Sequence, residues 1–589
     1  MYNNQNKQFH TIQNIISPSD RFPIDFGMYY RFDIFTRYSK IDDAIYTQKN
    51  GFIEFNTFYN SFSLGKFRKN TIIDNLTFSI KGEGKAAIQI FGRTHANIEY
   101  MLKECEIELS NEYTNIDISE LLDSEYVIIY PKIKAITDLK LNQLCFRSTT
   151  KPKQAKLGIV ITHFNRLKEI TFSAQNIKEN LLESPLYKDH IDLIIVDNSK
   201  NCGIKETQNI KVIPNLNYGG TGGFTRGLIE LEDNGNYTHC LFMDDDGACE
   251  IESIKRIYNF FKYSKAEDTA ISGMMLREDA PWMLHEKGGK FNDGNVYPIL
   301  HGLNLVDVNS LIHIENEDDK IEYGAWFFFG FPIKHVSQYA FPFFVRGDDI
   351  HFSLLNKFNI ISLSGVGVYS FDFAAKESGL TKYLNFRYNK MLSLTNGKNR
   401  IWFLKQFLKE YYKQVLSLNY GSAKMISFAM KGILSGPEYF EKNIDMQEIF
   451  KTFKTYCVGE TKKPIDPNNG LGFPLIVRPE KRGFRLLRKI TINGTLIPFF
   501  RKKLTVNHPN ESIANFKGIS RYKTVLYYER FSKTGYYAEQ NFIRFSVAII
   551  RSIGYSIKIL FIYGSVQKKY KKEFSKYTNK SFWKKIYKK

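Results

Sequence analysis

Cysteine is scarce in this chain of 589 residues, and the six cysteines lie far apart without any C-x-x-C pair. That spacing excludes the common zinc and redox motifs and indicates free thiols in a reducing compartment. The first ten residues, MYNNQNKQFH, contain no apolar core, so we expect no signal peptide. The sequence also lacks an uncharged apolar run of about 18 residues, the length that a membrane-spanning helix needs.

The nearest approach to such a run is residues 542–563, which Arg544, Arg551 and Lys558 interrupt. These cations recur every seven residues, which puts them near one face of a largely apolar helix. Such a helix could lie in the plane of a membrane with its cations toward lipid phosphate. It could equally pack on its own domain, and both interpretations stay open.

Acidic residues are in deficit, because 82 lysines and arginines face 61 aspartates and glutamates, giving a formal net charge of +21. Such an excess usually reflects a polyanionic partner. Residues 566–589 hold ten lysines, one acid and six interleaved aromatic residues. We interpret this tail as a contact with an anionic membrane surface, with a solvated terminus as the alternative. A single-stranded nucleic-acid tail would look similar, but we expect no nucleic-acid partner.

The length predicts several domains, because 589 residues exceed one ordinary hydrophobic core. Residues 1–150 contain short segments that alternate polar and apolar residues, which predicts a β-sandwich. Over residues 151–400, continuous apolar runs alternate with helical segments, which predicts a Rossmann-like α/β domain with a mostly parallel sheet. Residues 401–589 are interpreted as a mainly helical domain with the basic tail.

Three consecutive carboxylates, Asp244, Asp245 and Asp246, follow the apolar run 240–243. Ligands of α/β sheets bind where the strands end, and a divalent cation would relieve the repulsion among the carboxylates. Mg²⁺ and Mn²⁺ prefer oxygen ligands, so we expect Asp244 and Asp246 to share one of them. Asp245 would point away, toward a sugar hydroxyl. A solvated acidic loop is the alternative.

Polar residues also follow the neighbouring apolar runs. Asp197 can hydrogen-bond a uracil or ribose, and Arg166 can approach a base or phosphates. The run 217–226, NYGGTGGFTR, contains Asn217, Gly219 and Gly220 and opens a helix. Its glycines let the backbone approach a ligand, although the run is neither a Walker loop nor a G-x-G-x-x-G motif. We interpret it as a donor-site loop, with a flexible turn as the alternative.

A second acidic pair, Asp348 and Asp349, lies in the segment RGDD. Sugar transfer with inversion needs a base that takes a proton from the acceptor hydroxyl, and this pair suits the task. Asp is also common at helix N-termini, so the pair has a structural interpretation as well. Upstream, Trp326 begins an aromatic run, and we expect it near the site with the phenylalanines in the core.

Taken in order, THFNR, VDNS, NYGGTGGFTR, FMDDD, AWFF and RGDD resemble the family 2 glycosyltransferases of GT-A fold. More narrowly, the chain is similar to the mycobacterial polymerising UDP-galactofuranosyltransferases. The resemblance covers residues 50–400 and includes TFYNSF at 57–62. It implies Mn²⁺ or Mg²⁺ on Asp244 and Asp246, Asp349 as the base and Asp348 as an acceptor contact. The contacts that it implies for the UDP-sugar or acceptor are Arg166, Asp197, Asn217, Asp245 and Trp326.

The implied reaction is an inverting transfer of galactofuranose from UDP-galactofuranose onto a bacterial surface glycan, free or lipid-linked. UDP-galactopyranose or UDP-glucose as donor is one alternative, and a non-catalytic glycan-binding protein is another. The enzyme would work in the cytoplasm, on the inner face of the cell membrane. A homo-oligomer is left open.

The sequence departs from this family at two positions. Ser370 stands where the family has a metal-binding histidine, and Asp372 or an additional water would then complete the metal site. A glutamate that the family has after an aromatic strand is replaced near Gly288 and Gly289. Because that region faces the sugar in the relatives, the identity of the sugar depends on it.

Overall fold

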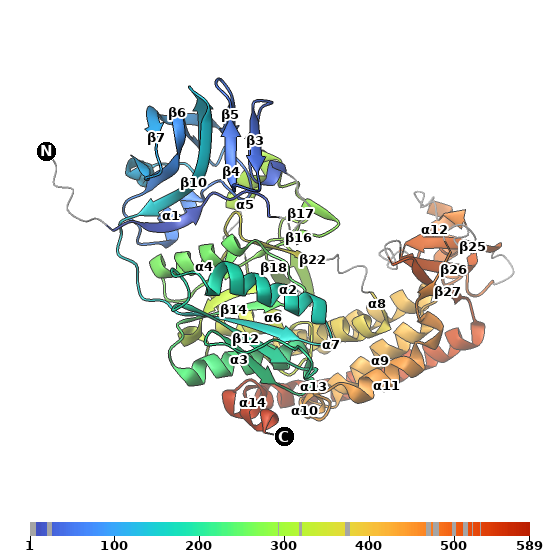
Figure 1. Ribbon diagram of the computed structural model, residues 1–589. Coiled ribbons are helices and arrows are strands. Elements are labelled where there is room, and N and C mark those ends of the chain that lie inside the picture. Colours follow the sequence, from blue (N-terminus) through green and yellow to red (C-terminus); the bar gives the residue numbers. More distant parts are fainter. Residues whose placement is uncertain are drawn as a thin grey trace.

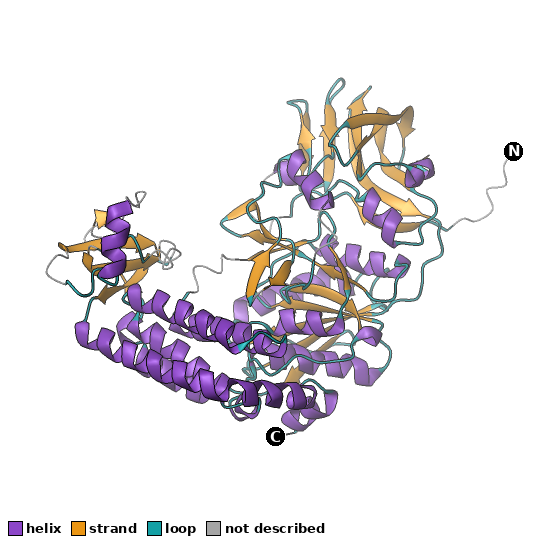
Figure 2. Cartoon of the chain, turned by 180° about the vertical axis from the view of Figure 1, so that it is seen from behind, coloured by secondary structure: helices purple, strands orange, loops and turns teal. Residues whose placement is uncertain are grey.

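The computed structural model describes residues 8–19, 26–292, 294–316, 321–370, 377–466, 473–474, 482–497, 502–509, 516–520, 522–529 and 532–588. They form a β-rich N-terminal body, a central α/β body and a long helical arm with a small sheet at its far end (Figure 1). Figure 2 shows strands gathered in the N-terminal body and helices in the arm. All six cysteines carry free thiols.

The N-terminal body is a β-sandwich whose strands pair antiparallel. Its strands are β1 (His10–Asn14), β2 (Arg31–Phe32), β3 (Thr36–Ser39), β4 (Ala44–Thr47), β5 (Phe52–Glu54), β6 (Thr77–Arg93), β7 (Glu99–Leu109), β8 (Thr114–Asp117), β9 (Ile128–Ala135) and β10 (Leu139–Ser148), with helix α1 (Leu64–Asn70). The long strand β6 belongs to both layers, because it pairs first with β8 and β10 and then with β7 and β9. Gly84, with φ +98°, lies where the pairing changes.

The central body contains a mixed seven-stranded sheet. Its strands are β11 (Leu157–His163), β12 (Ile191–Asp197), β13 (Ile210–Pro214), β14 (His239–Asp244), β15 (Thr269–Ser272), β20 (Phe328–Pro332) and β21 (Asn359–Ile361). The order is β13-β12-β11-β14-β20-β15-β21, with β11 to β14 parallel and β20 antiparallel to both neighbours. The apolar runs therefore form an α/β sheet that is parallel in its first half.

Helices flank this sheet, and two small sheets extend it (Figure 1). The helices are α2 (Leu167–Ile177), α3 (Gly219–Asn234), α4 (Ile251–Tyr263), α5 (Val308–Asn316) and α6 (Asp348–Asn356). The small sheets are β17-β16-β22 and β18-β19, formed by β16 (Met274–Arg277), β17 (Ala280–Glu286), β18 (Gly289–Asn292), β19 (Asn295–Pro298) and β22 (Gly367–Ser370).

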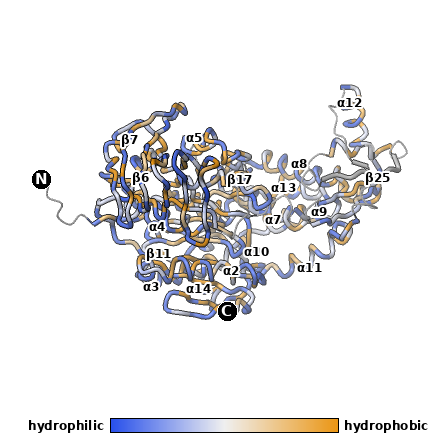
Figure 3. Tube along the Cα trace, turned by 45° about the horizontal axis from the view of Figure 1, so that its top comes forward, coloured by the Kyte–Doolittle hydropathy of each residue, from blue (hydrophilic) through white to orange (hydrophobic). Residues whose placement is uncertain are grey.

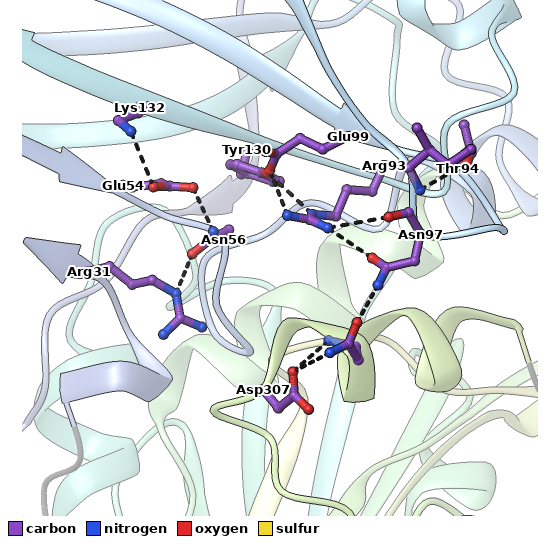
Figure 4. Close-up of polar contacts among 12 residues, drawn as sticks. Arg31, Glu54, Asn56, Arg93, Thr94, Asn97, Glu99, Tyr130, Lys132 and Asp307 are labelled. Carbon is purple, nitrogen blue, oxygen red and sulfur yellow. Dashed lines mark hydrogen bonds and ion pairs between the residues drawn. The ribbon is translucent and has the colours of Figure 1, made fainter.

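Polar contacts join the sandwich to the central body. Figure 4 shows side chains along this edge, from Arg31 on the sandwich to Asp307 on the central body. Arg31 donates a hydrogen bond to the carbonyl oxygen of Val306 over 2.6 Å. In the buried interior, the hydroxyls of Tyr59 and Tyr369 lie 2.9 Å apart. The TFYNSF motif, which contains Tyr59, therefore holds the two bodies together.

The helical arm contains a small sheet that the prediction of a mainly helical C-terminal domain missed. The helices are α7 (Gly379–Thr395), α8 (Arg400–Leu416), α9 (Tyr420–Leu434), α10 (Glu438–Lys442), α11 (Gln447–Tyr456), α12 (Arg482–Ile490), α13 (Phe542–Tyr577) and α14 (Lys580–Tyr587). The sheet comprises β23 (Lys463–Pro464), β24 (Phe473–Pro474), β25 (Lys502–Pro509), β26 (Tyr522–Glu529) and β27 (Thr534–Glu539). Helix α7 packs on α9, so the arm begins before the predicted boundary at residue 400. Hydrophobic and hydrophilic residues alternate along the arm (Figure 3), as amphipathic bundle helices require.

The basic tail folds back onto the central body. Tyr570, Tyr577 and Trp583 are buried, and the Trp583 indole donates to the carbonyl oxygen of Ala340 over 2.9 Å. The Tyr587 hydroxyl donates to the carbonyl oxygen of Gly222 over 2.6 Å. The prediction that the aromatic residues of the tail lie among lipid headgroups is therefore wrong, because the protein itself buries most of these rings.

Candidate active site

The register of the parallel strands brings the predicted polar residues to one edge of the sheet. Thr162 on β11 lies opposite Asp244 on β14, and His163 lies opposite Asp197 on β12. The residues after these positions therefore leave the sheet side by side, as the sequence predicts. Asp244 and Asp246 remain partly exposed at this edge, whereas Asp245 is buried.

Arg166 holds two of the three consecutive carboxylates. Its Nη1 atom lies 2.8 Å from Asp245 Oδ1 and 2.8 Å from Asp246 Oδ2, and 43% of its side chain is exposed. The other oxygen of Asp245 lies 3.4 Å from the Nδ1 atom of the buried His163. Burial raises the pKa of Asp245, and the Arg166 charge opposes that shift. Asp245 therefore holds Arg166 from a buried position, and its predicted contact with a sugar hydroxyl stays a prediction.

Asp197 organises the loop that follows β12. Its Oδ1 accepts hydrogen bonds from the backbone and hydroxyl of Ser199 at 2.9 and 3.0 Å, and its Oδ2 accepts one from the Cys202 backbone at 2.8 Å. Burial acts to raise the pKa of Asp197, but these hydrogen bonds outweigh it and lower the pKa below its ordinary value. The carboxylate is thus kept charged at the sheet edge. Its predicted contact with a nucleotide stays a prediction.

The glycine run forms the start of α3 and is not a flexible loop. Gly219 has φ +69°, and a Cβ atom there would lie 2.1 Å from the carbonyl oxygen of Phe344. A Cβ atom on Gly223 would lie 2.3 Å from the Thr162 side chain. These two glycines therefore let α3 pack closely against its neighbours. A Cβ atom on Gly220 would meet nothing nearer than 3.7 Å, so this position retains space.

Asn217 lies two residues before the first residue of this helix, Gly219, and its Oδ1 accepts a hydrogen bond from the Gly219 backbone over 3.1 Å. Its side chain is partly exposed. The predicted roles of Asn217, Gly219 and Gly220 in donor binding concern the first turn of α3, because a helix N-terminus favours an anion. These roles stay predictions.

The Asp348–Asp349 pair begins α6 after a strained turn. Phe344 and Arg346 have φ of +73° and +66°, a left-handed conformation that costs free energy in residues with a Cβ atom. The Thr221 hydroxyl at the start of α3 donates to Asp348 Oδ2 over 2.7 Å. The acidic pair is therefore tied to the start of α3, and the strain is concentrated beside it.

Burial raises the pKa of Asp349 well above its ordinary value, and the negative charges of Asp348, Glu286 and Asp244 add to the shift. Burial alone raises the pKa of Glu286, at the end of β17, to about 7. Burial also raises the pKa of Asp348, although the Thr221 hydrogen bond opposes the shift. The charges of Asp244, Glu286 and Asp348 therefore all act on Asp349. Glu286, with a pKa of about 7, is suited to proton transfer near neutral pH.

Glu286 was missed by the sequence prediction, which considered the family's glutamate to be replaced near Gly288 and Gly289. The residue lies two positions before Gly288 and is buried on β17. A carboxylate at the end of a predicted aromatic strand was the available signal. The site therefore contains a glutamate, Glu286, whose charge acts on Asp349.

Trp326 is a core residue. Its side chain is buried and packs edge-on against the rings of Phe224, Phe242 and Phe352, with ring centroids 5.4, 4.8 and 5.5 Å away. Its predicted place beside the acceptor or the sugar stays a prediction. Aromatic residues at sheet edges pack equally well in cores, and here the ring lies between α3, β14 and α6.

A complete metal site is not evident from the described residues. Within them, no group of three or more histidine, cysteine, aspartate or glutamate side chains is close enough to hold a metal ion. Ser370 ends β22, where its carbonyl oxygen accepts a hydrogen bond from the Glu278 backbone over 3.1 Å. Asp372, the predicted substitute for the family's histidine, lies outside the described residues.

No protein-family profile matches the chain. Two relatives do, both galactofuranosyltransferase GlfT2. The Mycobacterium tuberculosis protein is 21% identical over 500 residues, which is 75% of this chain and 76% of that protein. The Mycolicibacterium smegmatis protein is 21% identical over 426 residues, which is 66% of this chain and 64% of that protein.

Solved structures match more weakly. GalNAc-T7 with UDP, GalNAc and Mn²⁺ matches with a TM-score of 0.30 and 10% identity, covering 40% of this chain and 47% of that one. A family 29 carbohydrate-binding module with cellulohexaose matches with a TM-score of 0.16 and 18% identity, covering 24% of this chain and 91% of the module. TM-scores this low carry no inference. From the sequence relationship, the chain resembles the GlfT2 galactofuranosyltransferases along three quarters of its length.

Proposed function

We propose that the chain is an inverting, metal-dependent glycosyltransferase that moves galactofuranose from UDP-galactofuranose onto a bacterial surface glycan. The observation that supports it most is that the charges of Asp348, Glu286 and Asp244 all act on Asp349, with Asp244 at the end of the parallel strand β14. The relationship to GlfT2, named a galactofuranosyltransferase, supports the choice of sugar. UDP-galactopyranose or UDP-glucose remains the second candidate donor, since the identity is 21%.

Asp349 is the proposed base. Because its pKa is raised well above the ordinary value, the carboxylate binds a proton more readily than a solvent-exposed aspartate does, as proton abstraction from an acceptor hydroxyl requires. Asp348, held by Thr221, would accept a hydrogen bond from the same acceptor and orient it. Arg166, Asp197, Asn217, Gly219 and Gly220 are the proposed contacts of the UDP moiety.

The proposed cofactor is Mn²⁺ or Mg²⁺ on Asp244 and Asp246, where it would supply charge neutralisation for the departing diphosphate. The donor set fits a hard cation, because both carboxylates are partly exposed at the sheet edge and Asp244 adds to the electrostatic load on Asp349. Arg166 already neutralises part of the negative charge of this cluster, because it forms an ion pair with Asp246. The residues therefore suit a cation that brings further ligands of its own, such as water or phosphate oxygens.

A glycan or lipid-linked glycan is the proposed acceptor, and the proposed site of action is the cytoplasmic face of the cell membrane. UDP release with UDP-galactofuranose, UDP-galactopyranose and UDP-glucose, each with Mn²⁺ or Mg²⁺, tests the donor and the metal together. We expect turnover with UDP-galactofuranose. Glycan binding without turnover on any of the three donors would instead favour a non-catalytic glycan-binding protein.

Asp349→Asn tests the base. We expect kcat to fall by about 10²- to 10⁴-fold, the usual contribution of a general base, with the Kd for UDP unchanged. Asp189→Asn, a change at an exposed loop aspartate, is the matched control and should turn over like the parent protein. Parental kcat in the Asp349→Asn protein would refute the assignment.

A further inference from the structure

Helix α13 exposes a continuous apolar stripe over its first 20 residues. We call Ile543, Val547, Ile550, Ile557 and Phe561 the α13 stripe; Ile543, Ile550 and Phe561 are 74, 70 and 83% exposed. These positions recur at intervals of three, four and seven residues, so they form one line along the helix. Gly554 occupies the gap in that line. No charged residue interrupts the line, which is unusual for a solvent-facing helix surface.

Cations border the stripe on one side. Arg544, Arg551 and Lys558 each follow a stripe residue by one position, which turns them about 100° around the helix. The neighbouring helix α8 exposes Lys405 and Lys409. An apolar line with cations along its edge is the arrangement of helices that lie in the headgroup layer of an anionic bilayer.

The opposite face of the same segment is fixed to the arm. Tyr411 donates to the carbonyl oxygen of Ala548 over 3.0 Å, and the hydroxyls of Tyr412 and Ser552 lie 2.7 Å apart. Tyr563 donates to the carbonyl oxygen of Lys398. Helix α13 has the length and composition of a membrane-spanning helix, but crossing a bilayer would break these contacts. The helix can meet lipid only along its exposed side.

From this geometry we infer that the α13 stripe docks in the plane of a bilayer that contains anionic phospholipids. A second copy of the chain suits the stripe less well, because a symmetric pairing would bring the cations of both copies together. Beyond residue 562 the exposed positions become Lys568, Lys571 and Lys572, so the apolar surface ends where the helix reaches the central body. The lipid-binding element is thus the first half of α13, and the aromatic tail is internal.

The inference concerns location and does not depend on the proposed reaction. It is tested with the full chain and vesicles of phosphatidylglycerol and phosphatidylcholine, against vesicles of phosphatidylcholine alone, by co-sedimentation. We expect binding to the anionic vesicles, and a loss of at least about tenfold in Ile550→Asp/Phe561→Asp. Ile34→Asp/Ile41→Asp, at two almost fully exposed residues of the sandwich, is the matched control and should bind like the parent protein.

Arg544→Gln/Lys558→Gln should weaken binding to anionic vesicles and reduce its dependence on salt. Equal sedimentation of the parent and the Ile550→Asp/Phe561→Asp protein would overturn the inference. So would a parent protein that ignores vesicles but forms a dimer that the same double substitution dissociates. UDP release with a soluble acceptor, measured on every variant, reports folding and keeps a failure of the proposed reaction separate from a failure of membrane binding.

Discussion

Thr221→Val removes one hydrogen bond and preserves the shape of the side chain. The Thr221 hydroxyl donates to Asp348 Oδ2 over 2.7 Å, and both residues are buried. Hydrogen bonds to charged groups contribute about 1.5–3 kcal/mol, and about 1.4 kcal/mol corresponds to a tenfold change. If this bond holds Asp348 in its productive position, its loss should lower kcat/KM by about 10- to 150-fold.

The same substitution should shift the pH dependence. The Thr221 hydrogen bond lowers the pKa of Asp348 against the effect of burial. Without it that pKa rises, so Asp348 becomes charged only at higher pH and the rising limb of kcat/KM moves to higher pH. The assay is UDP release across a pH series, with Thr225→Val as control, since Thr225 is buried one turn later in α3. Parental rates in Thr221→Val, or an equal loss in Thr225→Val, would refute the reasoning.

Two further substitutions test the site and the tail. Glu286→Gln removes a charge that raises the pKa of Asp349, so the rising limb of kcat/KM should move to lower pH. A limb that stays in place across the pH series would mean that Glu286 does not influence the proton transfer. Trp583→Ala removes a fully buried ring, at a cost of about 3–5 kcal/mol, so the Tm in a thermal melt should fall clearly. Lys585→Ala, with a side chain 70% exposed, should leave the Tm nearly unchanged, and equal melts for the two variants would mean that the tail does not pack.

The strand ends could be predicted because each carries its own local signal. The apolar runs before Asp197 and Asp244 are long enough to be strands buried on both faces, and parallel strands end at a common edge. The mutual approach of Asp244 and Asp349 could not be derived from spacing, because it depends on how α6 docks beside the sheet. Only the family resemblance placed Asp244 and Asp349 in one site.

The wrong predictions share one cause, which is that composition does not reveal what a side chain packs against. Trp583 was expected at a lipid surface, yet tertiary contacts bury its ring. The glycine run was interpreted as a donor-site loop because glycines let the backbone approach a ligand, whereas Gly223 lies within α3 and is needed for its contact with β11. The small sheet of the arm was missed because β23 and β24 span only two residues each and helix α12 lies between β24 and β25.

The return of the chain end to α3 has a practical consequence. Tyr587 reaches Gly222, a residue 365 positions earlier, and Lys584 lies 2.7 Å from Asp233 at the far end of the same helix. An affinity tag or fluorescent protein fused after residue 589 would start beside the helix whose first turn carries the candidate phosphate contacts. Purification and imaging are therefore better served by a fusion before β1, which belongs to the N-terminal sandwich and pairs with β10.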